Sequence, residues 1–480
     1  MNILFATSEL YPLVKTGGLA DVSYSLPLAL QQLGESVTVV MPGYRSVRQK
    51  LGQPLRQYRF QDEFLYPDIV LGEYFDDRLS VRLLLVESDS LYDRDGGPYE
   101  NALSEAWHDN HERFAQFCRA VTSLLGGGCA EYPGKFDVVH CNDWQTGLIP
   151  ALVSYLRIPV KTVFTIHNLA YQGIFNYDAF RRLSLPEQWW HIDGVEFYGN
   201  FSFLKAGIVF ADWVTTVSPT YAAEILNEPA ACGMGGLLQH HQNKLVGILN
   251  GADYTVWNPS SDPNILFHFD SESVDEKTKN KLDLQRHMGL RLSKSTPLIG
   301  VVSRLVDQKG VDWILSAMEA MQGEKLQWVI LGTGNKEFEQ RFRAMSEANP
   351  KTIAVIIGYD ETLAHRIEAA SDLFAMPSRY EPCGLNQIYS LRYGTLPIVR
   401  RTGGLADTVV DADDDAIRQA TATGFVFEQP SAEALTAVVR RAIALYSKRK
   451  TWKKIQLTAM AQCFDWGHSA QSYLDLYKQE

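Results

Sequence analysis

The feature that most constrains the fold is the alternation of short apolar runs with segments of helical periodicity. Ile3–Ala6 is a run of the kind that forms a buried strand. Apolar side chains then recur at helical spacing from Leu19 to Leu33, and Gly34 follows, where a helix would stop. Val37–Met41 is the next apolar run. A β-loop-α-β unit of this kind implies that its two strands pair in parallel.

The same alternation runs through the rest of the chain in two series. The first adds apolar runs at Phe136–His140, Thr162–Ile166 and Trp213–Val217, and the second begins after residue 290. We therefore predict an α/β protein with two doubly wound domains. Their boundary is expected within residues 240–260, which hold polar His240–Lys244 and the turn-prone pair Asn250-Gly251. The second series comprises predicted strands at Leu298–Val302, Trp328–Leu331, Ile353–Ile357, Leu373–Met376 and Leu396–Val399, and predicted helices at Gly310–Met321, Glu361–Ala370 and Ala432–Leu445.

Composition narrows the classes of function. At about 100–200 residues per domain, 480 residues suit two or three domains. The net charge of −11 disfavours nucleic acid and anionic membranes as partners, although a small anionic ligand needs only a few local cations. We find no signal-peptide pattern at the start and no run of 18 apolar residues. Six cysteines without a CxxC pair argue against a disulfide framework or a zinc site, and favour a reducing compartment; they are Cys118, Cys129, Cys141, Cys232, Cys383 and Cys463.

One seven-residue pattern occurs twice. Lys15–Asp21 has the sequence KTGGLAD, and Arg401–Asp407 has the sequence RTGGLAD. The first copy follows the first predicted strand, where ligands of open α/β sheets bind. Its paired glycines permit close backbone approach, and Lys15 and a helix N-terminus both favour an anion. A phosphate-binding loop and a plain turn with a surface lysine remain equal alternatives on these residues. The GxGxxG and GxxxxGK[ST] patterns are absent, which disfavours NAD enzymes and P-loop NTPases.

Two loops of the second series carry charged side chains directly after strands. Ser303–Gly310 holds Arg304 and Lys309 between a strand and a helix start, which suits phosphate, although a solvated loop is the ordinary interpretation. Gly332-Thr333-Gly334 is a further loop for close approach. Glu381 follows the strand Leu373–Met376 and precedes an apolar helix, so it is either a ligand-binding carboxylate or a helix cap.

In the first series, polar residues also follow strands. His167-Asn168 ends the run Thr162–Ile166, and Asp143 comes shortly after Phe136–His140. Two patterns that could suggest metal ligands are given structural roles. His108, His111 and Glu112 are expected in a helix, and the acidic cluster Asp411, Asp413, Asp414 and Asp415 is expected to be a solvated loop because no strand leads into it.

With these motifs, the chain resembles the bacterial glycogen synthases and plant starch synthases. These are retaining glycosyltransferases of family 5 with the two-domain GT-B fold. The resemblance covers nearly the whole length. It is carried by KTGGL at Lys15–Leu19, HNLAYQG at His167–Gly173, Ser303-Arg304 with Lys309-Gly310, EPCGL at Glu381–Leu385 and TGGL at Thr402–Leu405.

The resemblance implies a cytoplasmic or plastid enzyme that uses ADP-glucose, an α-1,4-glucan acceptor, no cofactor and no metal. It implies an acceptor-side domain over residues 1–245, a nucleotide-sugar domain over 246–460 and a C-terminal helix over 461–480 that returns to the first domain. Arg304 and Lys309 would stabilise the departing diphosphate, Glu381 would hold the glucose hydroxyls, and His167 would lie near the reacting carbon. The other implied substrate-binding residues are Lys15 and Gly18 at the phosphates, Gly358, Tyr359 and, more weakly, Tyr92 at the adenine, Asn168, Asp21 and Asp143 near the sugar or acceptor, and Gly17, Asn250, Ser303, Gly332, Cys383, Gly384 and Leu385.

Two positions depart from patterns common among related transferases. Tyr389 stands eight positions after Glu381, where many carry a second glutamate that contacts the ribose. Cys141-Asn142 precede Asp143, where relatives often have a histidine. Three alternatives stay open: a sugar-nucleotide epimerase, a non-catalytic glucan-binding protein, and a transferase of the same fold that uses UDP-glucose. The residues also leave open whether the acceptor attacks from the leaving group's face or through a double displacement.

Overall fold

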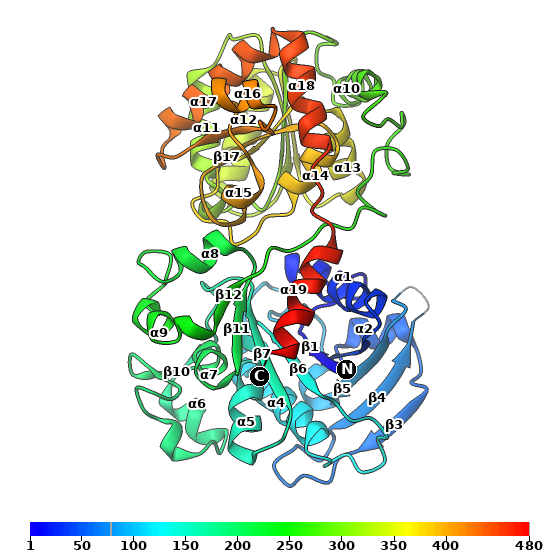
Figure 1. Cartoon of the computed structure of the whole chain (residues 1–480), viewed down its shortest axis with the longest axis vertical. Helices are drawn as coiled ribbons and strands as arrows, with labels where there is room; N and C mark the ends of the chain where they lie inside the picture. Colours follow the sequence, from blue (N-terminus) through cyan, green and yellow to red (C-terminus); the bar gives the residue numbers. More distant parts are fainter. Residues whose placement is uncertain (77–78, 480) are drawn as a thin grey trace. The chain divides into compact units, whose positions relative to one another are not determined.

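The computed structural model describes residues 1–76 and 79–479, and the chain divides into two compact units. The N-terminal unit comprises Met1–Asn250 together with Trp466–Glu480, and the C-terminal unit comprises Gly251–Asp465. Each unit is built around its own mainly parallel sheet, with helices packed against it (Figure 1). Going along the chain, the first boundary between the two units falls within the turn-prone pair Asn250-Gly251. This is a few residues beyond the boundary that we expected after residue 245.

The N-terminal unit's sheet has nine strands within the described residues, in the order β12-β11-β7-β6-β1-β2-β5-β4-β3. Strand β1 lies between β2 and β6 and is parallel to both. The chain first builds outward through β2 and later returns to place β6 on the other side of β1. The switch point of this sheet, where ligands of such folds bind, therefore lies at the carboxyl ends of β1 and β6. The strands are β1 (Asn2–Ala6), β2 (Ser36–Pro42), β3 (Arg56–Arg59), β4 (Val70–Phe75), β5 (Arg82–Glu87), β6 (Val138–Asn142), β7 (Lys161–Ile166), β11 (Trp213–Thr216) and β12 (Leu245–Gly247).

Helix α1 (Gly18–Gln32) begins directly after Gly17, and Gly34 lies beyond its end with φ of 92°. This confirms the helix predicted from the spacing of its apolar residues. A short sheet of order β8-β10-β9 accompanies the main one, with strands β8 (Ile174–Phe175), β9 (Glu196–Phe197) and β10 (Asn200–Ser202). The other helices of the unit are α2 (Arg45–Leu51), α3 (Asp89–Tyr92), α4 (Asn110–Leu125), α5 (Leu148–Leu156), α6 (Tyr177–Arg182), α7 (Phe203–Phe210), α8 (Pro219–Glu224), α9 (Gly235–His240) and α19 (Trp466–Lys478).

The last helix, α19, belongs to the N-terminal unit and packs beside α1 (Figure 1). Its Tyr477 hydroxyl lies 2.7 Å from Nδ1 of buried His140, whose Nε2 lies 2.6 Å from Oγ1 of Thr165. Burial lowers the pKa of His140 to about 3, so the ring is neutral and can accept at one nitrogen while it donates at the other. These bonds tie the last residues of the chain to β6 and β7.

The C-terminal unit has a six-stranded sheet of order β15-β14-β13-β16-β17-β18, and all its pairings are parallel within the described residues. The chain runs outward from β13 to β15 and then returns to place β16 on the other side of β13. The switch point lies at the carboxyl ends of β13 and β16. The strands are β13 (Leu298–Val302), β14 (Gln327–Gly332), β15 (Ile353–Ile357), β16 (Leu373–Met376), β17 (Leu396–Arg400) and β18 (Phe425–Phe427). The helices are α10 (Lys277–His287), α11 (Val311–Ala320), α12 (Lys336–Ala348), α13 (Glu361–Ala370), α14 (Asn386–Arg392), α15 (Gly403–Thr408), α16 (Asp414–Gln419), α17 (Ala432–Tyr446) and α18 (Arg449–Met460).

The predicted strands and helices of both series are confirmed to within a few residues at their ends. The acidic cluster is a correction. It is not a solvated loop: Asp413 accepts a bond from the backbone N–H of Ala416 as the N-cap of α16, and Asp414 lies in the first turn. Asp411 forms an ion pair with Arg441. Carboxylates at a helix N-terminus complement its dipole, which is why this stretch folds as a helix start.

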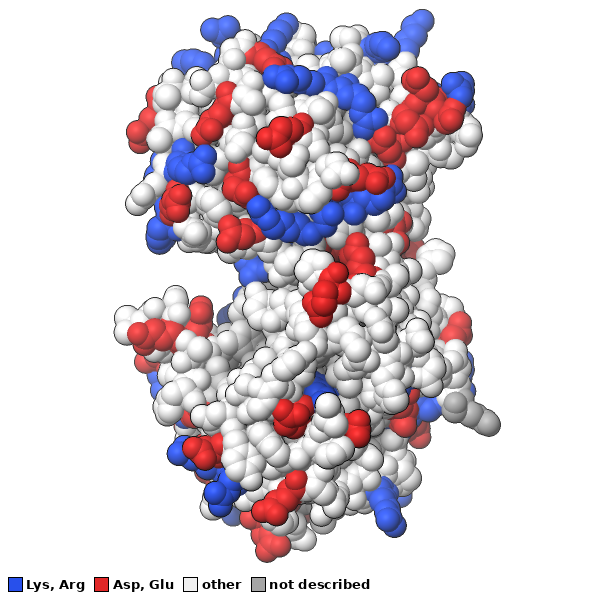
Figure 2. All heavy atoms as spheres, turned by 90° about the vertical axis from the view of Figure 1, so that its left-hand side faces the viewer, with Lys and Arg blue, Asp and Glu red and all other residues white. Residues whose placement is uncertain are grey.

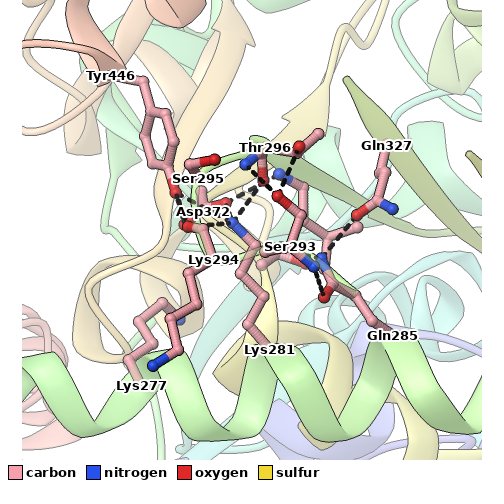
Figure 3. Close-up of polar contacts among 12 residues, drawn as sticks. Lys277, Lys281, Gln285, Ser293, Lys294, Ser295, Thr296, Gln327, Asp372 and Tyr446 are labelled. Atoms are coloured by element: carbon pink, nitrogen blue, oxygen red, sulfur yellow. Dashed lines mark hydrogen bonds and ion pairs between the residues drawn. The ribbon is translucent and has the colours of Figure 1, made fainter. Parts of the chain in front are cut away.

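Helix α10 is polar on most of its surface, yet it is anchored by two buried lysines (Figure 3). Lys281 donates to Oδ2 of Asp372 at 2.5 Å, to the Tyr446 hydroxyl at 3.0 Å and to the Thr296 carbonyl at 2.6 Å. Asp372 directly precedes β16 and also accepts from the backbone N–H of Leu298, the first residue of β13, at 2.8 Å. The cluster therefore fixes the amino ends of the two strands whose carboxyl ends form the switch point.

On the face shown in Figure 2, Lys and Arg are interspersed with Asp and Glu. In the C-terminal unit, ion pairs such as Arg341–Glu319 and Arg440–Glu324 also place opposite charges side by side. This face therefore lacks the single-sign field by which proteins attract nucleic acid. None of the described helices is both long enough and apolar enough to cross a membrane.

Candidate active site

The carboxylate of Glu381 lies at the switch point of the C-terminal unit, in the loop after β16. Its side chain is buried, and its Oε2 accepts from Lys309 Nζ at 2.6 Å and from Ser378 Oγ at 2.8 Å. Lys309 comes from the loop after β13. The structure thus brings together two of the four predicted catalytic residues, one from each loop. Arg304, in the same loop as Lys309, is exposed.

Arg379 holds these two loops together. Its backbone N–H donates to the Gln308 carbonyl at 2.8 Å, and its Nη1 donates to the Asp307 carbonyl at 2.8 Å. Its guanidinium also forms both bonds of a fork with Asp312, each at 2.7 Å, and lies over the Trp313 ring. Such bidentate pairs fix geometry as well as charge. Sequence reasoning missed Arg379 because a loop arginine beside Glu381 gives no sign of which way its side chain turns.

The second copy of the repeated pattern packs behind Glu381. Gly403 has φ of 44°, and a Cβ at this position would lie 1.9 Å from the Glu381 carbonyl oxygen. A Cβ at Gly404 would lie 2.2 Å from the Cys383 carbonyl oxygen. The N–H of Gly404 donates to the carbonyls of Glu381 and Pro382 at 3.2 and 3.1 Å. These glycines are required because the chain approaches the Glu381 segment too closely for any side chain.

The other predicted residues of the C-terminal unit surround the same sheet edge. A Cβ at Gly332 would lie 2.0 Å from the Ser303 carbonyl oxygen, so the end of β14 touches the loop after β13. Gly358 and Tyr359 follow β15, with φ of 151° at Gly358 and a ring 74% exposed at Tyr359. The EPCGL segment continues into α14: Cys383 is buried, Gly384 has φ of 72°, and Leu385 is the N-cap.

Tyr389, the position where many relatives carry a second glutamate, is buried in α14. Its ring stacks on Trp257 at a centroid distance of 4.0 Å, and the opposite face of the same Trp257 stacks on His365 at 3.6 Å. Nδ1 of His365 lies 2.8 Å from Oδ2 of buried Asp262. Tyr389 thus completes an aromatic stack inside the unit.

In the N-terminal unit, the loop after β1 carries the first copy of the pattern. Lys15 Nζ lies 2.9 Å from Oδ1 of Asp21. A Cβ at Gly17 or Gly18 would meet nothing within 4 Å, unlike one at the equivalent glycines of the second copy. Packing within the chain therefore does not require glycine here. This loop is open at its glycines, as close approach by a ligand requires.

The loops after β6 and β7 bring Asp143, His167 and Asn168 together. Asp143 has φ of 57°, and its Oδ1 accepts from the His167 backbone N–H at 2.8 Å. Burial raises the pKa of Asp143 to about 7, although backbone hydrogen bonds from His167 and Asn168 oppose the rise. Burial also lowers the pKa of His167 to about 3, so its ring is neutral.

Asn142 fixes the tautomer of His167. Its Nδ2 donates to the Ala6 carbonyl at 3.0 Å, so its Oδ1 faces Nε2 of His167 at 2.9 Å as an acceptor. The neutral ring then carries its proton on Nε2, and Nδ1 is the acceptor nitrogen. Asn142 was noted in the sequence as a departure from relatives, but its contact with His167 was not predicted.

One predicted substrate contact, Tyr92, has another placement, and a second, Asn250, has an unpartnered side-chain oxygen within the described residues. Tyr92 is 1% exposed, and its hydroxyl donates to the Arg113 carbonyl at 2.7 Å. Helix α3 turns this ring into the core, so we remove Tyr92 from the candidate site. Asn250 is buried, and its Oδ1 has no hydrogen-bond partner within the described residues.

His111 belongs to a pattern that could have suggested a metal site, and the structure gives it a packing role. His111 lies in α4 with its ring against Phe175, and burial lowers its pKa. Across residues 1–76 and 79–479, no group of three or more His, Cys, Asp or Glu side chains could hold a metal ion.

Residues 2–240 match the family model described as starch synthase catalytic domain, and residues 287–456 match that of glycosyl transferases group 1. The chain is 47% identical to glycogen synthase 2 of Nitrosococcus oceani, over 100% of this chain and 97% of the relative. It is 48% identical to the glycogen synthase of Thioalkalivibrio sulfidiphilus, over 100% and 99% respectively. The chain belongs to the glycogen and starch synthase family of glycosyltransferases.

Similar solved structures support this family assignment and the fold. The catalytic domain of starch synthase IV from Arabidopsis thaliana, bound to ADP and acarbose, matches with a TM-score of 0.87 and 32% identity over 99% of this chain and 98% of that one. Sucrose-phosphate synthase from Thermosynechococcus elongatus, at 17% identity and a TM-score of 0.62, shares the fold. The predicted GT-B fold is thus confirmed. Membership of the glycogen synthase family favours a glucan-elongating transferase over the epimerase and the non-catalytic binding protein.

Proposed function

We propose that this glycogen synthase family member transfers glucosyl units from ADP-glucose to the non-reducing end of an α-1,4-glucan, with retention and without a metal ion. Relatives named glycogen synthase align over the whole chain, and the similar starch synthase IV structure is bound to ADP and acarbose. The observation that carries the proposal is the Lys309–Glu381 pair, whose 2.6 Å contact joins the two loops at the sheet's switch point.

The reaction breaks the bond between the anomeric carbon and the diphosphate, which leaves with the electron pair. A glucan hydroxyl forms the new bond and loses its proton, which the leaving phosphate accepts. Negative charge therefore concentrates on the departing oxygens, where fixed cations stabilise the transition state. We assign this role to Arg304 and Lys309, and we assign Glu381 to the hydroxyls of the transferred glucose.

Tyr359 and Gly358 are assigned to the adenine of the donor. Tyr359 is 74% exposed, and its hydroxyl donates to the Glu361 carboxylate, which restrains the side chain. An exposed, restrained ring offers a face for base stacking.

In the N-terminal unit, Lys15 and Gly18 are assigned to the donor phosphates. Asp21, Asp143, His167 and Asn168 are assigned to the sugar and the acceptor.

The test is transfer of label to glucan. Purified protein receives glycogen and either radiolabelled ADP-glucose or radiolabelled UDP-glucose, with excess EDTA, and the label in precipitated glucan is counted. We expect transfer from ADP-glucose, and its loss in Glu381→Ala. The control Glu324→Ala removes a carboxylate from the exposed pair with Arg440 and should keep full activity. Transfer from UDP-glucose alone would refute the donor assignment, sensitivity to EDTA would refute metal independence, and no transfer from either donor would refute the proposal.

A further inference from the structure

A buried carboxylate lies directly behind the loop that carries Lys15. Glu9 is 3% exposed, and its Oε2 accepts from the backbone N–H groups of Thr16 at 2.6 Å and Gly17 at 3.1 Å. Its Oε1 accepts from the Thr16 hydroxyl and from the Tyr99 hydroxyl, the latter at 2.7 Å. A carboxylate offers about four acceptor positions. Glu9 is therefore fully hydrogen-bonded, and three of its four donors belong to the loop.

This arrangement changes the expectation drawn from the sequence. The paired glycines suggested a loop whose backbone N–H groups face an anionic ligand. Two of those groups, on Thr16 and Gly17, instead face a carboxylate of the chain itself. The loop's shape is thus set from inside the protein. Its glycines remain open, because a Cβ at Gly17 or Gly18 would meet nothing within 4 Å.

Glu9 is itself held in place by a second segment. The Tyr99 hydroxyl, which donates to Glu9, also lies 2.7 Å from Ser8 Oγ. The Tyr99 carbonyl accepts from Asn110 Nδ2 at 2.9 Å, and the neighbouring Pro98 carbonyl accepts from Arg113 Nη1 at 2.9 Å. Asn110 and Arg113 both lie in α4. The carboxylate therefore joins the loop after β1 to a segment anchored on a buried helix.

We infer that Glu9 is a positioning residue for the donor: it fixes Thr16 and Gly17 so that Lys15 and Gly18 are presented in one geometry. The inference rests on the proposed function for its assignment of this loop to the donor. A carboxylate whose donors lie in the loop resists opening of the loop, because opening would leave the buried charge without partners. Removing Glu9 should therefore impair the enzyme's use of the donor more than its use of the glucan.

Two substitutions separate geometry from charge. In Glu9→Gln, the amide oxygen can accept both backbone N–H groups. The amide nitrogen then faces the Thr16 and Tyr99 hydroxyls, which can reverse their roles and accept. Glu9→Ala leaves all four donors without this partner. Glu87→Ala is the matched control, since Glu87 is a buried glutamate of the same unit that accepts from the Tyr74 hydroxyl at 2.6 Å and from Gln57 Nε2 at 3.0 Å.

The first measurement is amide hydrogen exchange of peptides that cover residues 10–21, compared with the rest of the chain. We expect faster exchange at Thr16 and Gly17 in Glu9→Ala, wild-type protection in Glu9→Gln, and no local change in Glu87→Ala. Tyr99→Phe, a milder variant that loses one donor, should give a smaller increase than Glu9→Ala. Unchanged exchange in Glu9→Ala and Tyr99→Phe would overturn the inference. This readout does not depend on the chemical activity of the protein.

The second measurement is steady-state kinetics with donor and glucan varied separately. A misplaced contact costs about 10²-fold, so we expect KM for the donor to rise and kcat/KM for the donor to fall by about that factor in Glu9→Ala, while KM for glucan stays constant. Glu9→Gln should rescue most of the loss. A merely structural role would lower the active fraction and leave both KM values unchanged, which would also overturn the inference. If the wild-type protein transfers nothing, the proposed function fails, and the exchange data still decide whether Glu9 fixes the loop.

Discussion

Nζ of Lys309 lies 2.6 Å from Oε2 of Glu381, and these two side chains come from loops that follow adjacent strands of the sheet. A buried carboxylate needs such a partner, and the pairing also places a cation where the proposed diphosphate would leave. Because one contact serves both purposes, removing the lysine should affect catalysis and local structure together.

Lys309→Met should lower kcat by about 10²–10³-fold, the range found when one stabilising donor is removed from a transition state. The reason is that the methionine stem fills the space but leaves the departing diphosphate without this charge. The measurement is kcat at saturating donor and glucan. Lys453→Met is the control, because Lys453 forms a partly exposed pair with Asp275 and lies outside the candidate site. An unchanged kcat in Lys309→Met would remove Lys309 from the mechanism.

Gly403→Ala and Gly17→Ala test the two copies of the repeated pattern. A Cβ at residue 403 would lie 1.9 Å from the Glu381 carbonyl oxygen at φ of 44°, so we expect destabilisation of about 1–3 kcal/mol and loss of activity. Gly17 has φ of −155° and open space around it, so its alanine variant should keep its stability within about 0.5 kcal/mol and lose donor affinity. Urea unfolding and ADP titration measure the two effects. Equal stability losses would contradict this division of roles.

Asp143 and His167 should give opposite slopes of stability against pH. Burial raises the pKa of Asp143 from 3.8 to about 7, so the folded state binds its proton more tightly, and stability falls as pH rises through that window. Burial lowers the pKa of His167 from 6.5 to about 3, so the unfolded state binds the proton more tightly, and stability rises as pH rises through that window. In the wild type the two slopes largely cancel.

Single variants should expose each slope. Asp143→Asn should make the unfolding free energy rise with pH between about pH 4 and pH 6, by up to about 1.4 kcal/mol per pH unit. His167→Gln should make it fall over the same interval. Urea unfolding at several pH values measures both. Parallel pH profiles for the two variants and the wild type would show that neither group titrates as proposed.

Sequence patterns predicted most strands and helices of the two sheets, but only some of the residues of the candidate site. Leu298–Val302 and Glu361–Ala370 were predicted with their observed bounds, because buried parallel strands are continuously apolar and the helices between them are amphipathic. Helix α10 was missed, because it is polar on most of its surface and four of its five buried residues, Lys277, Asn280, Lys281 and Gln285, are polar. Glu9 and Arg379 were missed because their roles depend on hydrogen bonds to backbone groups that no sequence pattern marks. Tyr92 was placed at the adenine only by the resemblance, and the sequence did not show that the short helix α3 turns its ring into the core.

The buried Lys281–Asp372 pair offers a test of how the sheet's amino ends are held. The two side chains are 3% and 12% exposed and 2.5 Å apart, and the same carboxylate oxygen accepts from the N–H of Leu298. Lys281→Met would leave the carboxylate charged and without its cation, so we expect a loss of about 3–5 kcal/mol in unfolding free energy. Lys281→Met combined with Asp372→Asn should lose less, because the asparagine carries no charge while its amide oxygen can still accept from Leu298.

The control for this pair is Arg440→Met, which breaks the exposed ion pair with Glu324 and should cost less than about 1 kcal/mol. Urea unfolding of all three variants measures the differences. If Lys281→Met lost no more than Arg440→Met, the buried cluster would not hold β13 and β16. A double variant as unstable as Lys281→Met would show instead that the lysine's bonds to Thr296 and Tyr446, and not the charge of Asp372, make the larger contribution.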